Sequence, residues 1–438
     1  MARTLAYRYV ICLIIFFSYI LVFFHRLCPA VIGLEMQETF GISGTLLGVL
    51  ASAYFYPYAI MQVPSGILAD YWGPRKTVTT FFLLAAFGSI LMGMAPNLPM
   101  AILGRILVGF GVSVLFVSNF KLLSEWFSPS GFTIMGGIFL AMGGIGALSS
   151  SLPLAWASNL VGWRMTLVIV GGITLMMAFL IYGLVRNRPS DMGLPSIGTT
   201  HEDAAEGLMS LSQGMKLVVT SPRFWALSIW GFCTAGVSFA LGGLWGGPYL
   251  IHVYGLNKTA AGQVLSMFAA ALIVGGPLSG WAANRAGRKP VLMGCSLLLT
   301  AVSGCFYAFT GELSLPLLYL LFFLFFLGAA APAPVFAAAG KELFPASMAG
   351  TSIGTLNILP FLGGAILQVV TGSILARRGP VGPVYALAGY RDMFLLYLSV
   401  SVLSLVASFF LKETFIRRDS APLPSGGADL APRRSWGH

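Results

Sequence analysis

The sequence predicts an all-α membrane protein with twelve transmembrane helices, arranged as two related halves of six helices each. Of its 438 residues, 57% are hydrophobic and 9% are charged, whereas about a quarter of the residues in an ordinary soluble domain are charged. Long apolar runs recur along the chain, for example residues 9–24, 81–94 and 315–334. A polar motif around residue 70 returns around residue 284. The composition predicts membrane spans, and the returning motif predicts the two halves.

The apolar runs define the predicted helices in chain order. About 20 apolar residues cross a bilayer core, where each backbone group must be paired within its own segment, which favours helices. The predicted spans are residues 8–34, 43–70, 75–95, 98–123, 130–160, 163–186, 223–252, 258–284, 288–311, 314–343, 345–376 and 390–411. The first run is too long for the apolar part of a cleaved signal and lacks a small-residue cleavage site, so we expect it to remain as the first helix.

Prolines and glycines add local detail to these helices. Pro248 in the seventh helix, and Pro332 and Pro334 in the tenth, are expected to kink or break them. Small residues that let helices approach closely are concentrated in the fifth and eleventh helices. They are Gly136, Gly137, Gly143, Gly144, Gly146, Gly350, Gly354, Gly363 and Gly364.

The polar segments predict the domain boundaries. Residues 1–186 form an N-terminal bundle of six helices, and residues 223–412 form a C-terminal bundle of six. Residues 187–222, rich in polar side chains, are expected to be a cytoplasmic linker. Residues 413–438, rich in Pro, Gly, Ser and Arg, are expected to be a disordered cytoplasmic tail.

The net charge of +11 reflects membrane topology rather than a nucleic-acid partner. With both termini cytoplasmic, the inner segments and helix ends hold 18 of the 25 Lys and Arg residues, as the positive-inside rule requires. The outer side holds five: Arg164, Lys258, Arg377, Arg378 and Arg391. A multi-pass protein of the plasma membrane or bacterial inner membrane is therefore expected, with the lipid bilayer as its surroundings.

Enzyme chemistry finds no support in the sequence. The five cysteines have no paired spacing, and the four histidines, at 25, 201, 252 and 438, are scattered, so neither a metal site nor a disulfide framework is indicated. The chain contains neither a P-loop nor a Gly-x-Ser-x-Gly motif. We expect no cofactor, no covalent catalysis and no direct use of ATP.

Two arginines lie deep in the predicted helices, whereas all 14 acidic residues lie at helix ends, in loops or in the tail. At about 1.5 Å per residue, Arg26 lies roughly 12 Å and Arg105 roughly 10 Å below the outer helix ends. Charged groups at bilayer depth are costly, and they mark functional sites. A guanidinium suits two-point recognition of a carboxylate or phosphate. The sequence therefore predicts a cationic site for a small anionic molecule.

Alternatives stay open for each deep polar residue. Arg105 could instead hydrogen-bond to carbonyls of the first helix, and Lys121 is near enough to the interface to extend into water. Histidine titrates near neutral pH, so His25 could carry a coupling proton or bind substrate. It could equally be a neutral side chain bonded to the backbone.

The repeated motif resembles the cytoplasmic signature of the major facilitator superfamily. The first copy comprises Gly66, Asp70, Gly73, Arg75 and Lys76, and the second comprises Gly280, Asn284, Arg288 and Lys289. Arg105-Ile-Leu-Val-Gly109-Phe-Gly111 resembles the fourth-helix motif of the same superfamily. The resemblance implies two pseudo-symmetric bundles that rock around a central site. It also implies that the repeated motif is a gate latch.

Within that superfamily, several segments resemble the branch of anion:cation symporters, which move organic anions. They are Phe24-His25-Arg26, Tyr54, Tyr58, Gln62, Ser124-Glu-Trp-Phe127, Trp245, Tyr249, Asn357 and Val370-Thr-Gly372. Tyr54, Tyr58 and Gln62 are spaced to share one helix face, and the resemblance adds Trp245, Tyr249 and Asn357 as substrate contacts. Two acids that the branch associates with proton coupling are replaced here, one by His25 and the other by Val112.

The sequence therefore predicts a secondary transporter of a small organic anion, working as a symporter with H+ or by exchange for a counter-anion, and monomeric by default. A dipeptide carrier is an alternative, because the first two helices also resemble the lysosomal dipeptide carrier group and its bacterial relatives. A multidrug-type efflux transporter, a non-transporting membrane sensor and a channel are further alternatives.

Overall fold

The computed structural model describes residues 2–194, 211–345, 348–381 and 384–414. Within them the regular structure is helical apart from a two-stranded antiparallel hairpin, in which Pro380 pairs with Tyr385 and Val381 with Val384. The first half of the chain forms α1 (Ala2–Leu27), α2 (Pro29–Phe40), α3 (Gly44–Ser52), α4 (Phe55–Ile60), α5 (Pro64–Tyr71), α6 (Pro74–Met94), α7 (Leu98–Ser113), α8 (Leu115–Trp126), α9 (Pro129–Ser149) and α10 (Leu152–Leu184).

The second half is also mainly helical. After η1 (Pro189–Met192) and α11 (Leu211–Thr220), it forms α12 (Pro222–Ala240), η3 (Leu241–Trp245), α13 (Gly246–Tyr254), α14 (Lys258–Leu265), α15 (Met267–Ala286), α16 (Arg288–Ala308), α17 (Leu315–Ala329), α18 (Ala333–Glu342), α19 (Ala349–Arg378), β1 (Pro380–Val381), β2 (Val384–Tyr385) and α20 (Leu387–Phe409).

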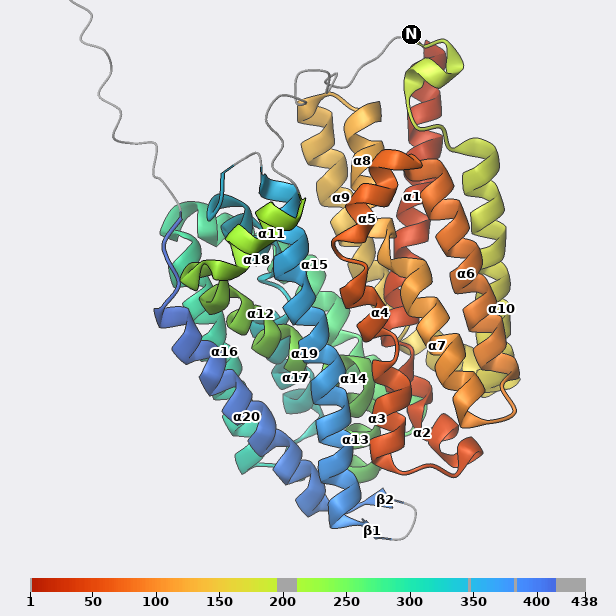
Figure 1. Cartoon of the computed structure of the whole chain (residues 1–438). Coiled ribbons are helices and arrows are strands. Elements are labelled where there is room, and N and C mark those ends of the chain that lie inside the picture. Colours follow the sequence, from red (N-terminus) through yellow and green to blue (C-terminus); the bar gives the residue numbers. More distant parts are fainter. Residues whose placement is uncertain (1, 195–210, 346–347, 382–383, 415–438) are drawn as a thin grey trace, which may run out of the picture.

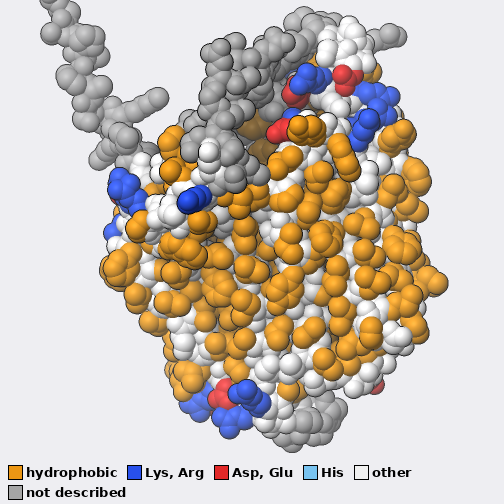
Figure 2. Space-filling model, viewed as in Figure 1, with side chains coloured by type: hydrophobic (Ala, Val, Ile, Leu, Met, Phe, Trp, Pro, Cys, Tyr) orange, Lys and Arg blue, Asp and Glu red, His pale blue; other side chains and the backbone are white. Residues whose placement is uncertain are grey.

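Many of these helices are long and apolar enough to cross a membrane. In the part of the chain that the structure describes there are ten such spans, and eleven if the helices of 44–60 and 64–71, bent by 58°, count as one. The 33-residue α10 contains Gly162 at φ 79°, where the predicted helices 130–160 and 163–186 divide. Figure 2 shows hydrophobic side chains in a wide band across the visible face of the molecule, with Lys and Arg toward both ends.

Among the predicted helices, 8–34, 43–70 and 314–343 are broken near a proline. The breaks in the first two correct the prediction, whereas the break in the third was predicted from Pro332 and Pro334. The breaks lie between α1 and α2, within the run from α3 to α5, and between α17 and α18. Pro29, Pro64 and Pro332 lie at these breaks. A proline supplies no N–H to the helix ladder, and its ring clashes with the carbonyl four residues earlier.

The predicted kink near Pro248 takes the form of a π-helix. Residues 241–245 form η3, which ends three residues before Pro248. The carbonyl that Pro248 cannot bond, four residues back, is that of Leu244. The wider π turn displaces this carbonyl without ending the helix, and η3 runs directly into α13.

The linker predicted for 187–222 contains regular structure. It includes η1 and α11, and α11 buries Val218 in a small apolar cluster with Phe224 and Leu356. This packing is the physical reason for a helix where only a polar connection was predicted. Residues 195–210 of the linker, and residues 415–438 of the predicted tail, lie outside the described residues.

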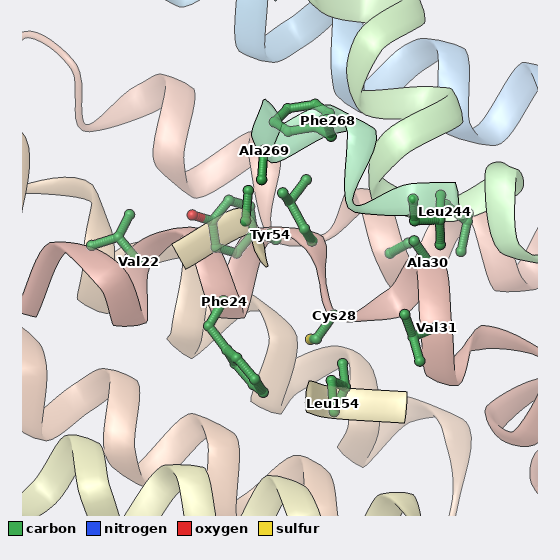
Figure 3. Close-up of a cluster of buried hydrophobic side chains, with 14 of the residues drawn as sticks. Val22, Phe24, Cys28, Ala30, Val31, Tyr54, Leu154, Leu244, Phe268 and Ala269 are labelled. Carbon is green, nitrogen blue, oxygen red and sulfur yellow. The ribbon is translucent and has the colours of Figure 1, made fainter. Parts of the chain in front are cut away.

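Helices of the two halves meet along the middle of the molecule (Figure 1). There α3 and α4 pack on α19, and α9 packs on α15. One hydrophobic core cluster includes residues of both halves, and Figure 3 shows part of it, with Tyr54 from the first half and Phe268 and Ala269 from the second. We call the end that carries β1 and β2 the hairpin end, and the opposite end, where residues 2 and 414 lie, the terminal end.

Candidate functional site

Arg26 lies near the end of α1 inside a cage of aromatic rings contributed by both halves. Its Cζ atom is 4.7 Å from the ring centre of Phe23 and 4.8 Å from that of Tyr58, both in the first half. It is 5.6 Å from the ring of Phe239 on α12 and 5.2 Å from that of Phe361 on α19. Ring faces carry negative charge density, which attracts the cation. The cage therefore holds a positive charge between the two halves.

The hydrogen-bonding capacity of Arg26 is largely unused. The guanidinium has five N–H donors, and Nε donates to the Tyr54 hydroxyl at 3.3 Å. The terminal amino groups donate to no other residue that the structure describes, and none of the ion pairs among those residues involves Arg26. Arg26 is only 5% exposed, and no carboxylate among the described residues balances its charge. An anion would supply that missing charge and accept hydrogen bonds from the unused amino groups.

Arg105 on α7 is also buried. Both of its terminal amino groups are occupied, whereas its Nε has no partner among the described residues. It donates to the carbonyl oxygen of His25, to that of Arg26 at 3.2 Å, and to the Cys28 sulfur at 3.8 Å. The His25 carbonyl would bond residue 29 in a continuous helix, and Pro29 has no N–H to offer. Arg105 thus caps the break between α1 and α2. This geometry supports the structural alternative for Arg105 and makes it a positioning residue for Arg26.

His25 faces a different neighbour from Arg26. Its Nε2 lies 3.1 Å from the Thr174 hydroxyl on α10. That hydroxyl donates to the carbonyl of Val170, so Nε2 is the donor to the Thr174 oxygen. Adjacent residues on a helix point about 100° apart, which separates the imidazole from the aromatic cage. The structure does not bring His25 into contact with the groups around Arg26.

Four predicted residues lie on the cage or one helical turn from it. Tyr54 and Tyr58 stack with ring centres 5.6 Å apart. Gln62 lies in the break between α4 and α5, where its amide donates to the Tyr58 carbonyl. Asn357, on α19, is one turn from Phe361 and partly exposed. These amides add neutral hydrogen-bonding groups on the terminal side of the cage.

Trp245 and Tyr249 are not part of this group. The Trp245 indole donates to the carbonyl of Gln368 toward the hairpin end, at 3.0 Å. The Tyr249 hydroxyl lies 3.0 Å from that of Tyr254, and its ring packs on Phe394. Both rings therefore pack within the second half, Trp245 against α19 and Tyr249 against α20. Neither ring is among those that contact Arg26 in the described residues, so a role of Trp245 and Tyr249 in substrate binding stays a prediction.

The first copy of the repeated motif ties together helix ends within the first half. Asp70 on α5 pairs with Lys121 on α8, whose ammonium also donates to the Ala69 carbonyl. Arg75 donates to the Tyr182 carbonyl on α10. Gly73 has a φ of 77° and begins α6. Two further members of the motif are less constrained, since Lys76 is exposed and a Cβ on Gly66 would meet no atom within 4 Å.

The second copy repeats this arrangement in the second half. Arg288 donates to Asn284 and pairs with Glu342 on α18. The backbone N–H groups of Arg288 and Lys289 donate to Glu413, just as that of Arg75 donates to Asn187. Gly280, like Gly66, has open space where a Cβ would lie. Both copies therefore brace their own half at the terminal end.

The ionic link between the two halves lies at the hairpin end, and sequence reasoning missed it. Glu35 on α2 pairs with Lys258 on α14. The Ser158 hydroxyl of α10 donates to Glu35 at 3.0 Å, and the Lys258 ammonium donates to Ser158 at 2.9 Å. Nearby, the Gln37 amide donates to the hydroxyl of Tyr385. Burial raises the pKa of this phenol, and the Gln37 contact acts against the rise.

Close backbone contacts accompany this link. A Cβ on Gly48 of α3 would lie 2.6 Å from the Gln368 carbonyl of α19, and one on Gly247 would lie 1.8 Å from the Ala30 carbonyl. Only glycine permits such approaches. The two halves are thus packed shut at the hairpin end.

The profile of the Major Facilitator Superfamily matches residues 11–367 of the chain, and a second match covers residues 247–438. The chain belongs to the Major Facilitator Superfamily. It is therefore an integral membrane protein with a fold of transmembrane helices, as the sequence motif predicted.

Relatives in this superfamily match nearly the full chain at low identity. A probable hexose phosphate transport protein of Chlamydia muridarum is 23% identical, covering 90% of this chain and 88% of its own. The probable sulfoacetate transporter SauU of Cupriavidus necator is 25% identical, covering 87% and 89%. The membrane sensor protein UhpC of Escherichia coli is 23% identical, covering 83% and 85%.

A solved structure of the superfamily has the same fold. The bacterial homolog of the human lysosomal transporter Spinster, in an inward-facing conformation, aligns with a TM-score of 0.74 at 19% identity. The alignment covers 92% of this chain and 96% of that one. This similarity concerns the fold of the superfamily alone.

Proposed function

We propose that this protein is a secondary transporter that moves a small organic anion by alternating access, with Arg26 holding the anionic group. The observation that carries the proposal is a buried guanidinium between the two halves, surrounded by aromatic rings and with most of its N–H donors unused. Such a group binds a carboxylate or related anion through two parallel hydrogen bonds. Neither ATP chemistry nor an enzyme reaction is part of this proposal.

The topology we infer has twelve crossings. The fifth runs through α9 to Gly162, and the sixth follows Gly162 in α10. Residues 1–186 and 223–412 form the two bundles, joined by 187–222. The terminal end is cytoplasmic, since 18 of the 25 Lys and Arg residues belong to segments on that side. The hairpin end then faces outward.

Alternating access follows from the contacts between the bundles. The latch of Glu35, Lys258 and Ser158 joins them at the outer end, whereas the repeated motif braces each bundle internally at the cytoplasmic end. The described conformation is accordingly closed to the outside. Rocking the bundles would part the cage, because Phe239 and Phe361 belong to one bundle and Arg26 to the other.

The relatives support an anionic substrate. Hexose phosphates and sulfoacetate, named in two of them, share negative charge rather than a common carbon skeleton. Coupling to H+ or to a counter-anion remains part of the proposal. His25 is the coupling candidate, and it would act from its position against Thr174 on α10.

A membrane sensor is the second candidate function, favoured by the similarity to the sensor protein UhpC. A sensor would bind an anion in the same cage without net transport. Binding alone therefore does not separate the two candidates, and flux does.

The test measures binding and flux with matched arginine variants. Purified protein is heated with monocarboxylates, dicarboxylates, sugar acids, phosphate esters and dipeptides, since a ligand of the native state raises apparent stability. Arg26→Gln should weaken binding about 10- to 100-fold, as expected for lost charged hydrogen bonds. Arg164→Gln is the control, because Arg164 also bonds backbone carbonyls and lies on an aromatic ring, but near the hairpin end.

The outcomes separate the candidates. Saturable uptake of the stabilising anion into proteoliposomes, lost in Arg26→Gln and kept in Arg164→Gln, supports the transporter. Binding without uptake or exchange supports the sensor. Stabilisation by neutral or cationic compounds alone, unchanged in Arg26→Gln, contradicts the anion site itself.

A further inference from the structure

The cage contains one positive charge that is available to a ligand. We infer that the site selects anions carrying a single negative charge and rejects dianions, an inference that rests on the proposed function of Arg26. Such selectivity would distinguish this protein from a carrier of fully ionised phosphate esters or dicarboxylates. The argument depends on the charges and donors that surround Arg26.

Arg105 does not supply a second charge to the ligand. Both of its terminal amino groups are committed to carbonyls of α1 and to the Cys28 sulfur. Its Nε has no partner among the described residues, but this atom is buried. The Tyr54 ring also lies 4.9 Å from the Arg105 Cζ, on the side toward Arg26. A ligand that recruited Arg105 would strip the His25 carbonyl of its donor, and Pro29 cannot replace it.

The second half contributes rings rather than cations. Its contacts with Arg26 are Phe239 and Phe361. The next polar group along that face of α19 is the neutral amide of Asn357, one turn away. Gln62, from the first half, is likewise neutral. These groups can bind hydroxyls or a carbonyl, and they leave a second negative charge unpaired in a buried site.

A dianion can still enter if a proton removes one of its charges. A phosphate monoester has its second pKa near 6, so about 3% is singly charged at pH 7.5 and about 90% at pH 5. Its apparent affinity should therefore rise about 30-fold between these two pH values. A monocarboxylate of pKa near 4 stays singly charged throughout and should change less than about twofold.

Protonation of protein groups around Arg26 can be distinguished from protonation of the ligand. The titratable or charged side chains that face Arg26 or adjoin it are Tyr19, His25, Tyr54, Tyr58 and Arg105. Tyrosine and arginine ordinarily titrate at pH 10 or above. Only His25 has an ordinary pKa between 5 and 7.5, so His25→Gln distinguishes protonation of the protein from protonation of the ligand.

The experiment uses full-length protein in detergent and three ligands on one six-carbon sugar skeleton. They are an aldonate with one carboxylate, an aldarate with two, and a 6-phosphate. Affinities are measured by calorimetry at pH 7.5 and pH 5 in wild type, His25→Gln and Arg26→Gln. The expected result is aldonate binding at both pH values, aldarate binding at least 30-fold weaker, and an approximately 30-fold gain for the phosphate that His25→Gln retains.

Other results overturn the inference in different ways. Aldarate or phosphate binding at pH 7.5 as tight as aldonate binding would refute single-charge selection and leave the anion transporter standing. A phosphate gain that disappears in His25→Gln would place the proton on the protein and refute it as well. Binding of none of the three, or binding unchanged in Arg26→Gln, would overturn the proposed function and the inference together.

A gain-of-charge variant gives an independent check. Asn357→Lys adds a cation one turn from Phe361, and it should improve aldarate binding at pH 7.5 by about tenfold or more while the aldonate changes less. An equal change for both ligands would contradict the inference, because a second charge should matter only to the dianion.

Discussion

The latch at the hairpin end gives a prediction about the balance between conformations. Lys258→Met removes the ammonium of the second half that binds both Glu35 and Ser158 of the first half. The carboxylate remains, held by one hydroxyl and by water. The hairpin end should therefore open more often in the variant.

The size of the effect follows from the exposure of the pair. The Lys258 side chain is 15% exposed and that of Glu35 is 33% exposed. Fully exposed pairs contribute up to about 1 kcal/mol, and breaking a fully buried pair costs about 3–5 kcal/mol. A partly buried pair with a bridging hydroxyl should contribute about 2 kcal/mol. At about 1.4 kcal/mol per tenfold change, this corresponds to a roughly 30-fold larger open fraction.

A buried thiol between the halves reports the open fraction. Leu244 on η3 is fully buried and lies 3.3 Å from where a Cβ on Gly33 of α2 would be. Leu244→Cys is introduced into protein lacking the five native cysteines. The rate of alkylation by a membrane-impermeant maleimide then measures exposure of this interface. With fast reclosing, the rate should rise about 30-fold when Lys258→Met is added.

Matched variants decide whether the latch is the cause. Arg378 and Asp392 form an ion pair at the same end but within the second half, 2.6 Å apart. Arg378→Met should leave alkylation within about twofold of the parent, and the exchanged pair Glu35→Lys with Lys258→Glu should recover most of the closure. A change below threefold in Lys258→Met, or an equal increase in Arg378→Met, would refute the reasoning.

Three further predictions concern packing and caps. Arg105→Gln leaves two helix carbonyls without donors. Its free energy of unfolding in detergent should therefore fall by about 2–4 kcal/mol, and its melting temperature should fall more than that of Arg26→Gln. Gly247→Ala places a Cβ 1.8 Å from a carbonyl oxygen and should hold the hairpin end open in the alkylation assay, whereas Gly276→Ala, with open space around it, should not. Gly73→Ala forces φ 77° on a residue with a side chain, and should lower stability by about 1–2 kcal/mol, whereas Gly66→Ala should be neutral or slightly stabilising.

The sequence predicted the family and the helices well because both depend on local pattern. The apolar runs placed helix ends mostly within a few residues, and the repeated motif led to the superfamily that the profile match shows. The breaks at Pro29 and Pro64 were missed, although each proline was visible in the sequence. A proline marks a possible break, and only packing decides whether the helix bends, opens or ends there.

The candidate site was predicted in part. Arg26 stood out because a charge in an apolar run is conspicuous, and Tyr54 and Tyr58 followed from their spacing. Phe239 and Phe361 gave no signal, since they are two of 33 phenylalanines. Glu35 and Lys258 are more than 200 residues apart in the sequence. No local pattern connects such residues, so their pairing could not be inferred from spacing.

The sequence by itself determined the membrane fold and the deep positive charge, because hydropathy and charge act on each segment independently of its neighbours, and its repeated motif predicts two related halves. The tertiary structure alone decided which arginine keeps its terminal amino groups without protein partners. Arg26 and Arg105 look equivalent as isolated residues, and the difference arises because Arg105 meets the carbonyls exposed by Pro29 while Arg26 meets aromatic rings from both halves. A donor is available to a ligand only when the fold leaves it without a partner.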